Sequence, residues 1–358
     1  MVQMRILFLN NYPMEEAFKA WKERQWPGHH LWGITELERL GFEVHILAHK
    51  TFPERLLFDH LRMRQRTRLN VGLGQQIRAL CKGRYDVVYS GCQDHTWLLA
   101  HLRSRGLFRK PIVAILHHPA NEWQMTNDFV NGHDRLICLS NGVKNSLLCS
   151  GLDFDRGKLR KLQWGVDLEF YNRWRTGFGK NWIETRKVVS AGKTNRDHDV
   201  LAQAVIDLNC EVEIYCSMDS RPTREPVPEN VLVSYRPNRE IAICYPKLVR
   251  VYEEASVICI PLKSVDSLAG LTSLMDALAL GRPVIMTRNR YVDIDIEALG
   301  FGLWVEPGDV PGWRLAISTV LENPALALEM GGKAAELGKQ WFTIQRFSED
   351  LARIFAEL

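Results

Sequence analysis

Short apolar runs alternate with helix-like segments along almost the whole chain, and this alternation limits the folds available to it more than any other feature. Strands that alternate with amphipathic helices are typical of parallel sheets whose crossover helices cover both faces. The sequence therefore predicts an α/β protein with doubly wound parallel sheets. The predicted strands are residues 5–10, 43–48, 86–90, 112–116, 135–139, 187–191, 211–216, 231–235, 257–261, 284–287 and 303–305.

The alternation is interrupted once, by a polar stretch with Trp and Gly at 172–187. A chain of 358 residues is long enough for two domains, each with its own core. We predict a Rossmann-like domain at 1–171, a linker at 172–187 and a second Rossmann-like domain at 188–342. The two domains are expected to face each other across a cleft, with ligands at the carboxyl ends of strands. Residues 343–358 are expected to form a helix that packs back toward the first domain.

The composition is that of a soluble globular protein, with 46% hydrophobic and 25% charged residues. A net charge of +4, evenly spread, is too small to indicate a nucleic-acid partner. The eight cysteines lack metal-ligand spacing, so we expect reduced, mostly buried thiols. The chain enters a strand at Arg5 without a leader and contains no run of eighteen apolar residues, which predicts a cytoplasmic protein.

Residues 266–285, DSLAGLTSLMDALALGRPVI, place a candidate binding loop, a helix and a strand in direct succession. The apolar spacing predicts a helix that begins near Leu271 and ends at Gly281, followed by a strand from Val284. An ordinary αβ unit of a parallel sheet would explain the apolar residues. It explains less well why Gly, Thr and Asp cluster around the start of the helix.

That helix start has the chemistry of a phosphate site. Gly270 permits close approach of the backbone, Thr272 offers a hydroxyl, and the unpaired N–H groups of the helix start near Leu271 can bind an anion. Asp276 lies within two turns of the same point, where its carboxylate could accept hydrogen bonds from ribose hydroxyls. We therefore expect a nucleotide at the start of this helix.

The same segment resembles the nucleotide-sugar signature of family 4 glycosyltransferases, Glu-x7-Glu followed by Ala-Met-Ala-x-Gly-x-Pro-Val. Residues 276–284, beginning with Asp276, match its second half. The first half departs, because Leu268 stands where the first Glu is expected and Asp266 is the nearest substitute. The resemblance implies the two-domain GT-B fold and retaining transfer of a hexose from a UDP- or GDP-sugar.

Weaker matches to the same family follow in the correct order along the chain. They are 26–30, which resembles the glycine loop and contains Gly28, 37–44, 134–140, 164–167 and 306–309. The resemblance thus extends over most of the chain, and it places Gly28 at the donor site.

The leaving nucleotide diphosphate develops negative charge, so positive groups are expected beside it. The family places an Arg and a Lys after the first strand of the second domain, in the pattern Gly-Arg-x4-Lys-Gly. The corresponding loop here, 192–197, is two residues shorter. The resemblance implies that Lys193 and Arg196 donate to phosphate oxygens. The alternative is that both are solvated loop cations.

His117 follows the predicted strand 112–116. A similarly placed His in the family contacts the donor sugar and the region where charge develops, so the resemblance implies that role for His117. His118 cannot share it, because adjacent residues that leave a strand point to opposite sides. A structural histidine is the alternative.

The loop after the first predicted strand, 10–13, contains neither an acidic residue nor a His. Inverting enzymes of this fold often place a base in that region, so its absence favours the retaining route. His29 and His30, next to Gly28, are the residues that could instead act as an inverting base.

A metal is not expected. Asp293-Ile294-Asp295 has an Asp-x-Asp form, but we interpret it as acids that precede a short helix at 297–299. Lys193 and Arg196 would then do the work of a metal. The only expected co-substrate is the nucleotide diphosphate sugar, and no cofactor is expected.

The acceptor is not indicated by the sequence. Residues 54–84 form a basic amphipathic segment that could touch an anionic membrane on its cytoplasmic face, and a solvated helix face is the alternative. Two readings other than a transferase also stay open. They are a sugar-nucleotide epimerase and a non-catalytic GT-B protein that binds nucleotide or glycan.

Overall fold

The computed structural model describes residues 3–49, 72–119, 125–177, 179, 181–236, 241–264 and 266–358. Contacts divide the chain into two compact units. The first comprises Met1–Trp164 together with Ile344–Leu358, and the second is Gly165–Thr343. The expected boundary at 171 falls inside a helix of the second unit, α8 (Leu168–Trp174).

The first unit contains a parallel sheet in the order β2-β1-β3-β4-β5-β6. Because β2 lies on one side of β1 and β3 on the other, the strand order reverses between β1 and β3. Five of the strands overlap predicted runs. The exception is β6, which has only three residues and one buried side chain, Leu159. The strands are β1 (Arg5–Leu9), β2 (Glu43–Ile46), β3 (Val87–Ser90), β4 (Ile112–Leu116), β5 (Arg135–Cys138) and β6 (Leu159–Lys161).

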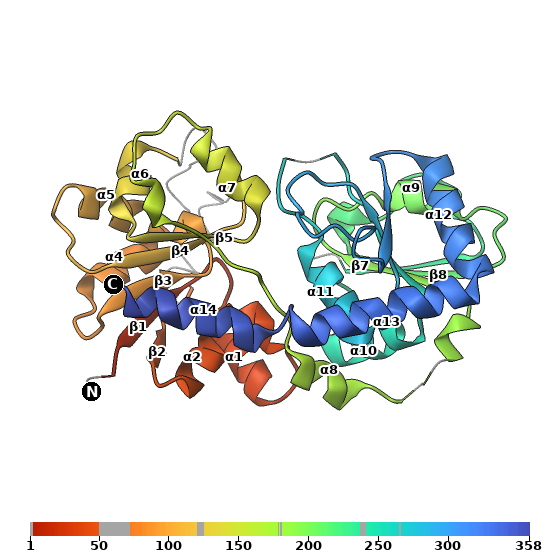
Figure 1. Ribbon diagram of the computed structural model, residues 1–358, viewed down its shortest axis with the longest axis horizontal. Coiled ribbons are helices and arrows are strands. Elements are labelled where there is room, and N and C mark those ends of the chain that lie inside the picture. Colours follow the sequence, from red (N-terminus) through yellow and green to blue (C-terminus); the bar gives the residue numbers. More distant parts are fainter. Residues whose placement is uncertain are drawn as a thin grey trace. The chain divides into compact units, whose positions relative to one another are not determined.

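Helices from both ends of the chain cover this sheet (Figure 1). The C-terminal helix α14 packs against α2, and the ring of Phe355 lies 5.8 Å from Phe42 and 5.4 Å from Tyr89. The last helix therefore completes the core of the first unit. The helices described here are α1 (Met14–Lys22), η1 (Gly28–Leu31), α2 (Ile34–Arg39), α4 (Leu73–Cys81), η4 (Gln93–Thr96), α5 (Trp97–Ser104), α6 (Asn127–Gly132), α7 (Asn141–Leu148), η5 (Arg156–Lys158) and α14 (Ile344–Ala356).

The second unit repeats the architecture with a parallel sheet in the order β12-β11-β10-β7-β8-β9. Here the order reverses between β7 and β10, which pair directly. Each strand overlaps a predicted run, and the strands buried on both faces, as β10 is, can be recognised as continuous apolar segments. The strands are β7 (Lys187–Gly192), β8 (Glu211–Ser217), β9 (Val231–Arg236), β10 (Val257–Ile260), β11 (Val284–Thr287) and β12 (Gly302–Val305).

Helices lie on both faces of the second sheet. On one face α9 contacts α12, and on the other α10 contacts α11 and α11 contacts α13 (Figure 1). Two doubly wound parallel sheets confirm the predicted α/β class. The helices described in this unit, besides α8, are η6 (Asn181–Ile183), α9 (His198–Ala204), η7 (Met218–Ser220), α10 (Tyr245–Glu254), α11 (Leu271–Leu280), α12 (Val310–Glu322) and α13 (Pro324–Gln340).

The basic segment 54–84 is only partly described. Residues 54–71 lie outside the described residues, and α4 occupies most of the remainder. Among the described helices, none combines the length and the apolar character needed to cross a bilayer.

Candidate functional site

The predicted loop, helix and strand are present in the second unit, and two glycines define the helix α11. Gly270 precedes it with φ +87°, and a Cβ there would lie 2.5 Å from Cε of Met286. Gly281 ends it with φ +63°, and a Cβ there would lie 2.9 Å from Cβ of Ala335. Because glycine has no side chain to cap the helix, the first N–H groups of α11 keep the capacity to bind an anion.

The loop after β7 is joined to the loop that leads into α11. The N–H of Asp197 donates to the carbonyl of Pro261 at 3.0 Å, and the N–H of Lys263 donates to the carbonyl of Asn195 at 3.0 Å. These loops leave the carboxyl ends of β7 and β10, the two strands between which the order reverses. Doubly wound sheets bind ligands at this switch point.

Arg196 lies in that loop, and its side chain points into the protein with 6% exposure. Its Nη2 donates to Oγ of Ser273 at 2.9 Å and to the carbonyl of Ala191 at 3.4 Å, and Nη1 donates to the carbonyl of Thr194 at 3.2 Å. Burial lowers the pKa of Arg196 from its ordinary value. Arg196 therefore braces the loop against the first turn of α11, and it is not a solvated loop cation.

Lys193 is half-buried in the same loop. Its backbone carbonyl accepts a hydrogen bond from Oγ of Ser217 at 3.0 Å, which ties the loop to the end of β8. Thr272, in the first turn of α11, is also half-buried, whereas Leu271 is buried. The described loop thus carries a half-buried lysine three residues before the buried Arg196.

Asp276 is buried in α11 with 3% exposure. The hydroxyl of Tyr171, from α8, donates to its Oδ1. Burial raises the pKa of Asp276 to about 7, and the Tyr171 hydrogen bond and the charge of Arg196 oppose that rise. A ribose hydroxyl at this carboxylate would donate to Oδ2 or share Oδ1 with the Tyr171 hydroxyl.

Asp266, the substitute for the missing first Glu, lies on the surface. Its carboxylate pairs with Arg290 at 2.6 Å, and the two side chains are 75% and 70% exposed. Exposed ion pairs of this kind contribute little to stability. Leu268 is half-buried, so this part of the altered signature supplies an apolar side chain and an exposed acid.

In the first unit His117 follows β4 and is held at two points. Its backbone N–H donates to Oε1 of Gln93 at 2.8 Å, and its ring Nε2–H donates to the carbonyl of Gly91 at 2.5 Å. Burial lowers the pKa of His117 to about 4, so the imidazole is neutral near pH 7. With the proton on Nε2, the lone pair is on Nδ1. His118 is exposed.

Gly28 begins the short helix η1 and is buried. The next residue, His29, is fully buried, and its carbonyl accepts a hydrogen bond from the indole N–H of Trp164 at 3.2 Å. Burial, together with the charge of His30, lowers the pKa of His29 well below its usual range. These contacts describe His29 as a neutral histidine within an aromatic cluster.

The expected helix after Asp295 is a turn, which corrects the sequence interpretation. Oδ1 of Asp295 accepts from the N–H of Ala298 and from the indole N–H of Trp304, each at 3.2 Å, and Gly300 with φ +71° ends the turn. Asp295 therefore organises a loop. Among the residues that the structure describes, no cluster of His, Cys, Asp or Glu could hold a metal ion.

Three partners at these sites were not predicted. Ser273, Tyr171 and Gln93 hold Arg196, Asp276 and His117, respectively. Of these three residues, only Ser273 could have been suspected from the sequence, because it is a polar residue on a largely apolar, buried helix. Tyr171 and Gln93 reach their partners across 105 and 24 residues of chain.

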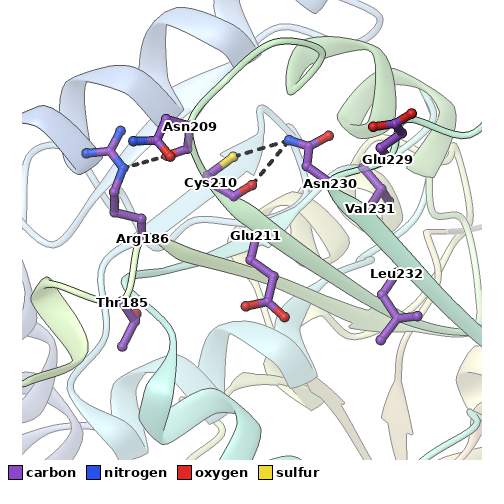
Figure 2. Close-up of a pocket in the computed structure, with 9 residues that line it drawn as sticks. All are labelled: Thr185, Arg186, Asn209, Cys210, Glu211, Glu229, Asn230, Val231 and Leu232. Carbon is purple, nitrogen blue, oxygen red and sulfur yellow. Dashed lines mark hydrogen bonds between the residues drawn. The ribbon is translucent and has the colours of Figure 1, made fainter.

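Two cavities of the second unit lie away from the switch point. Figure 2 shows one of about 540 Å³ at the amino ends of β7, β8 and β9, lined by residues that include Arg186, Cys210 and Asn230. The other, of about 500 Å³, lies at the end of α11, where Arg175 and Arg282 donate to the last carbonyls of the helix. Neither cavity includes the residues around Lys193 and Gly270.

Comparison with known proteins agrees with this architecture. Residues 34–170 match the sequence profile of Glycosyltransferase Family 4. Two D-inositol 3-phosphate glycosyltransferases are each 25% identical to the chain. The protein from Corynebacterium glutamicum (strain R) aligns over 84% of both chains, and that from Corynebacterium efficiens over 90% of this chain and 88% of its own.

Solved structures share the fold at low sequence identity. A sucrose-phosphate synthase from Thermosynechococcus elongatus superposes with a TM-score of 0.70 at 14% identity, covering 99% of this chain and 98% of its own. HepE from Anabaena, in complex with UDP-glucose, superposes with a TM-score of 0.66 at 15% identity, covering 99% and 100%. These superpositions confirm the GT-B fold, and the profile match over residues 34–170 confirms the resemblance to family 4 glycosyltransferases.

Proposed function

We propose that this GT-B protein, a relative of family 4 glycosyltransferases, transfers a hexose from a UDP- or GDP-sugar to an acceptor with retention of anomeric configuration and without a metal. The observation that carries the proposal is the junction of the loop 193–197 with the glycine-capped start of α11, at the strand reversal of the second sheet. The names of the related proteins, and the UDP-glucose bound to HepE, support a nucleotide-sugar donor.

In this proposal the donor diphosphate lies at the start of α11. The N–H groups of Leu271 and Thr272 and the amino group of Lys193 would donate to its oxygens. The buried guanidinium of Arg196 would contribute positive charge to the site, and its hydrogen bond to Ser273 would keep the loop in place. Such preorganised donors stabilise the charge that the leaving diphosphate acquires.

The reaction exchanges two bonds at the anomeric carbon. The bond to the diphosphate oxygen breaks as the bond to the acceptor oxygen forms, and the acceptor proton passes to the departing diphosphate on the same face of the sugar. His117 is proposed to contact the donor sugar as a neutral imidazole. The pKa of about 4 supports this, because a charged imidazolium would repel positive charge that develops at the anomeric carbon.

One observation favours the non-catalytic alternative. Leu268 replaces the first Glu of the signature, and Asp266 is committed to an exposed ion pair with Arg290. Nucleotide and glycan binding without transfer would need no carboxylate there. The epimerase alternative has no comparable support in the described residues.

A panel of UDP- and GDP-sugars separates these functions. The purified protein is incubated with each donor, and free nucleotide diphosphate and donor identity are followed. A transferase releases diphosphate slowly with water and faster with an acceptor, and the product keeps the anomeric configuration by NMR. Interconversion of donors would instead identify an epimerase, and binding without either reaction would identify a binding protein.

A peripheral membrane contact remains part of the proposal for the acceptor side. In α4, Ile77 is 47% and Leu80 is 38% exposed, and the exposed cations Lys82 and Arg84 follow directly. Apolar and basic side chains together favour an anionic bilayer surface. Sedimentation with vesicles that contain an anionic lipid should recover the protein, and Ile77→Ser with Leu80→Ser should reduce that recovery. Equal recovery with neutral vesicles would contradict the proposal.

A further inference from the structure

Trp32 adopts a backbone conformation that a bulky residue rarely adopts. It follows η1 with φ 53° and ψ 37°, in the left-handed region. That conformation costs about 1–2 kcal/mol for a residue other than glycine. It is held at two points, because the N–H of Trp32 donates to the carbonyl of His29 at 3.2 Å and its carbonyl accepts from the hydroxyl of Tyr89 at 2.7 Å. The strain is therefore maintained by the surrounding structure.

The left-handed backbone of Trp32 places its indole at the point of the first sheet where the strand order reverses. A Cβ on Gly91 would lie 2.6 Å from Cδ1 of Trp32 and 3.0 Å from Nδ2 of Asn10. Asn10 and Gly91 directly follow β1 and β3, the two strands between which the order reverses. Glycine at 91 thus makes the space that the indole fills, at the edge where ligands bind such sheets.

In that position the indole contacts His117. The two rings meet edge to face, with centroids 4.6 Å apart and planes at 77°. On its other side Trp32 stacks on Trp164, with centroids 5.1 Å apart and planes at 23°. Since Trp164 is fixed by its hydrogen bond to His29, the indole of Trp32 is held between a buried ring and the imidazole.

We propose that Trp32 is a positioning residue, whose indole holds the His117 imidazole in one orientation, with Nε2–H on the Gly91 carbonyl and the lone pair on Nδ1. The importance of this for transfer rests on the proposed function, which assigns His117 to the donor sugar. The same contact excludes water from one side of the imidazole, and burial already lowers the pKa of His117 to about 4. Core packing alone would be satisfied by an apolar residue on an unstrained backbone.

The test compares two variants that remove the contact in different ways. Trp32→Gly removes the indole but accepts φ +53° without strain. Gly91→Ala keeps the indole and displaces it with a new methyl group. Trp32→Phe retains an aromatic ring as the conservative variant. Gly83→Ala is the matched control, because a Cβ at Gly83 meets no atom within 4 Å.

The decisive measurement is ¹⁵N NMR of the histidine rings across pH, with His117 assigned by its absence in His117→Gln. The parent, Gly83→Ala and Trp32→Phe should show one tautomer, protonated at Nε2, with a low pKa. In Trp32→Gly and Gly91→Ala the pKa should rise toward 6.5 and both tautomers should appear. An unchanged titration and tautomer in both folded variants would overturn the proposal.

Kinetics separate this proposal from the proposed function. If the parent transfers sugar, Trp32→Gly should lower kcat about ten- to a hundredfold, as misplaced catalytic groups do. The Kd for UDP should not change, because the proposed phosphate contacts belong to the second unit. A parent that releases no diphosphate would refute the proposed function, while the NMR result would still decide whether Trp32 positions His117.

Discussion

The hydroxyl of Tyr171, in α8, donates a hydrogen bond to Oδ1 of Asp276, in α11. Both side chains are almost fully buried, and the charge of Arg196 acts on the carboxylate from the neighbouring loop. Burial nevertheless dominates and raises the pKa of Asp276 to about 7. An acid that titrates near neutral pH therefore lies within the helix that is proposed to bind the donor.

The raised pKa makes the stability of the protein depend on pH. The folded state holds the Asp276 proton more tightly than the unfolded chain, so this group stabilises the fold fully below about pH 4 and loses that contribution as pH rises through about 7. Asp276→Asn lacks this dependence. The free energy of unfolding of the parent, relative to Asp276→Asn, should fall by on the order of 1 kcal/mol per pH unit between pH 5 and 7. Urea titrations at several pH values measure it, and a constant difference would contradict it.

Nucleotide binding tests whether Asp276 also serves the ribose. We expect Asp276→Asn to raise the Kd for UDP or GDP in calorimetry, because it removes the charge and one strong acceptor. Tyr171→Phe is the matched control, since it removes the hydrogen bond to Oδ1 of Asp276 and leaves the carboxylate in place. If Asp276→Asn binds nucleotide as the parent does, Asp276 has no ribose role.

We expect the replacement of Lys193 and of Arg196 to affect turnover alike but the melting temperature differently. A charge-assisted hydrogen bond is worth roughly 1.5–3 kcal/mol, so Lys193→Ala should slow turnover about ten- to a hundredfold. It should lower the melting temperature less than Arg196→Ala does, because Lys193 is only half-buried. Arg196→Ala should slow turnover and also lower the melting temperature, because it removes the buried guanidinium that donates to Oγ of Ser273 and to the carbonyl of Ala191. Turnover and thermal melts of both variants check this. Parent-like turnover in both would remove the loop from the phosphate site.

Gly270→Ala should destabilise the second unit through both strain and collision. The backbone has φ +87°, and the added Cβ would lie 2.5 Å from Cε of Met286. Gly41→Ala isolates the strain, since Gly41 has φ +91° and a Cβ there meets nothing within 4 Å. Gly41→Ala should cost about 1–2 kcal/mol, and Gly270→Ala should cost more. Equal losses of unfolding free energy in urea titrations of the two variants would show that Met286 moves aside without destabilising the fold.

Metal independence has a direct test. Excess chelator should leave the rate of diphosphate release unchanged, and added Mn²⁺ should not raise it, because Lys193 and the start of α11 are proposed to neutralise the diphosphate. Loss of activity with chelator and its recovery with Mn²⁺ would contradict the proposal.

The central strands could be predicted from the sequence because they are short apolar runs buried on both faces of a parallel sheet, as in β4 and β10. The start and end of α11 could be predicted for a related reason, since Gly270 and Gly281 are required by local backbone geometry. β6 was not predicted because it has only three residues, LRK, of which Leu159 is the single apolar one. The supposed helix after Asp295 failed because one carboxylate can organise a turn as readily as a helix start.

The orientation of the site residues could not be predicted in the same way. The resemblance to family 4 glycosyltransferases placed Arg196 at the phosphate site near α11, but its inward direction depends on Ser273, which is 77 residues away along the chain. The burial of Asp276 depends on Tyr171, 105 residues before it. Local patterns identify which residues come together at a switch point. They do not determine which of them turn toward the solvent.

The position of α14 has a consequence for the order of events during synthesis. The core around Phe42 and Tyr89 includes Phe355, yet the whole second unit is translated before that residue leaves the ribosome. Until then, the apolar surface that α14 covers remains open in the nascent chain. The first unit is thus translated first, but its core is complete only after α14 has been synthesised. Its exposed apolar surface is where a chaperone would be expected to bind during translation.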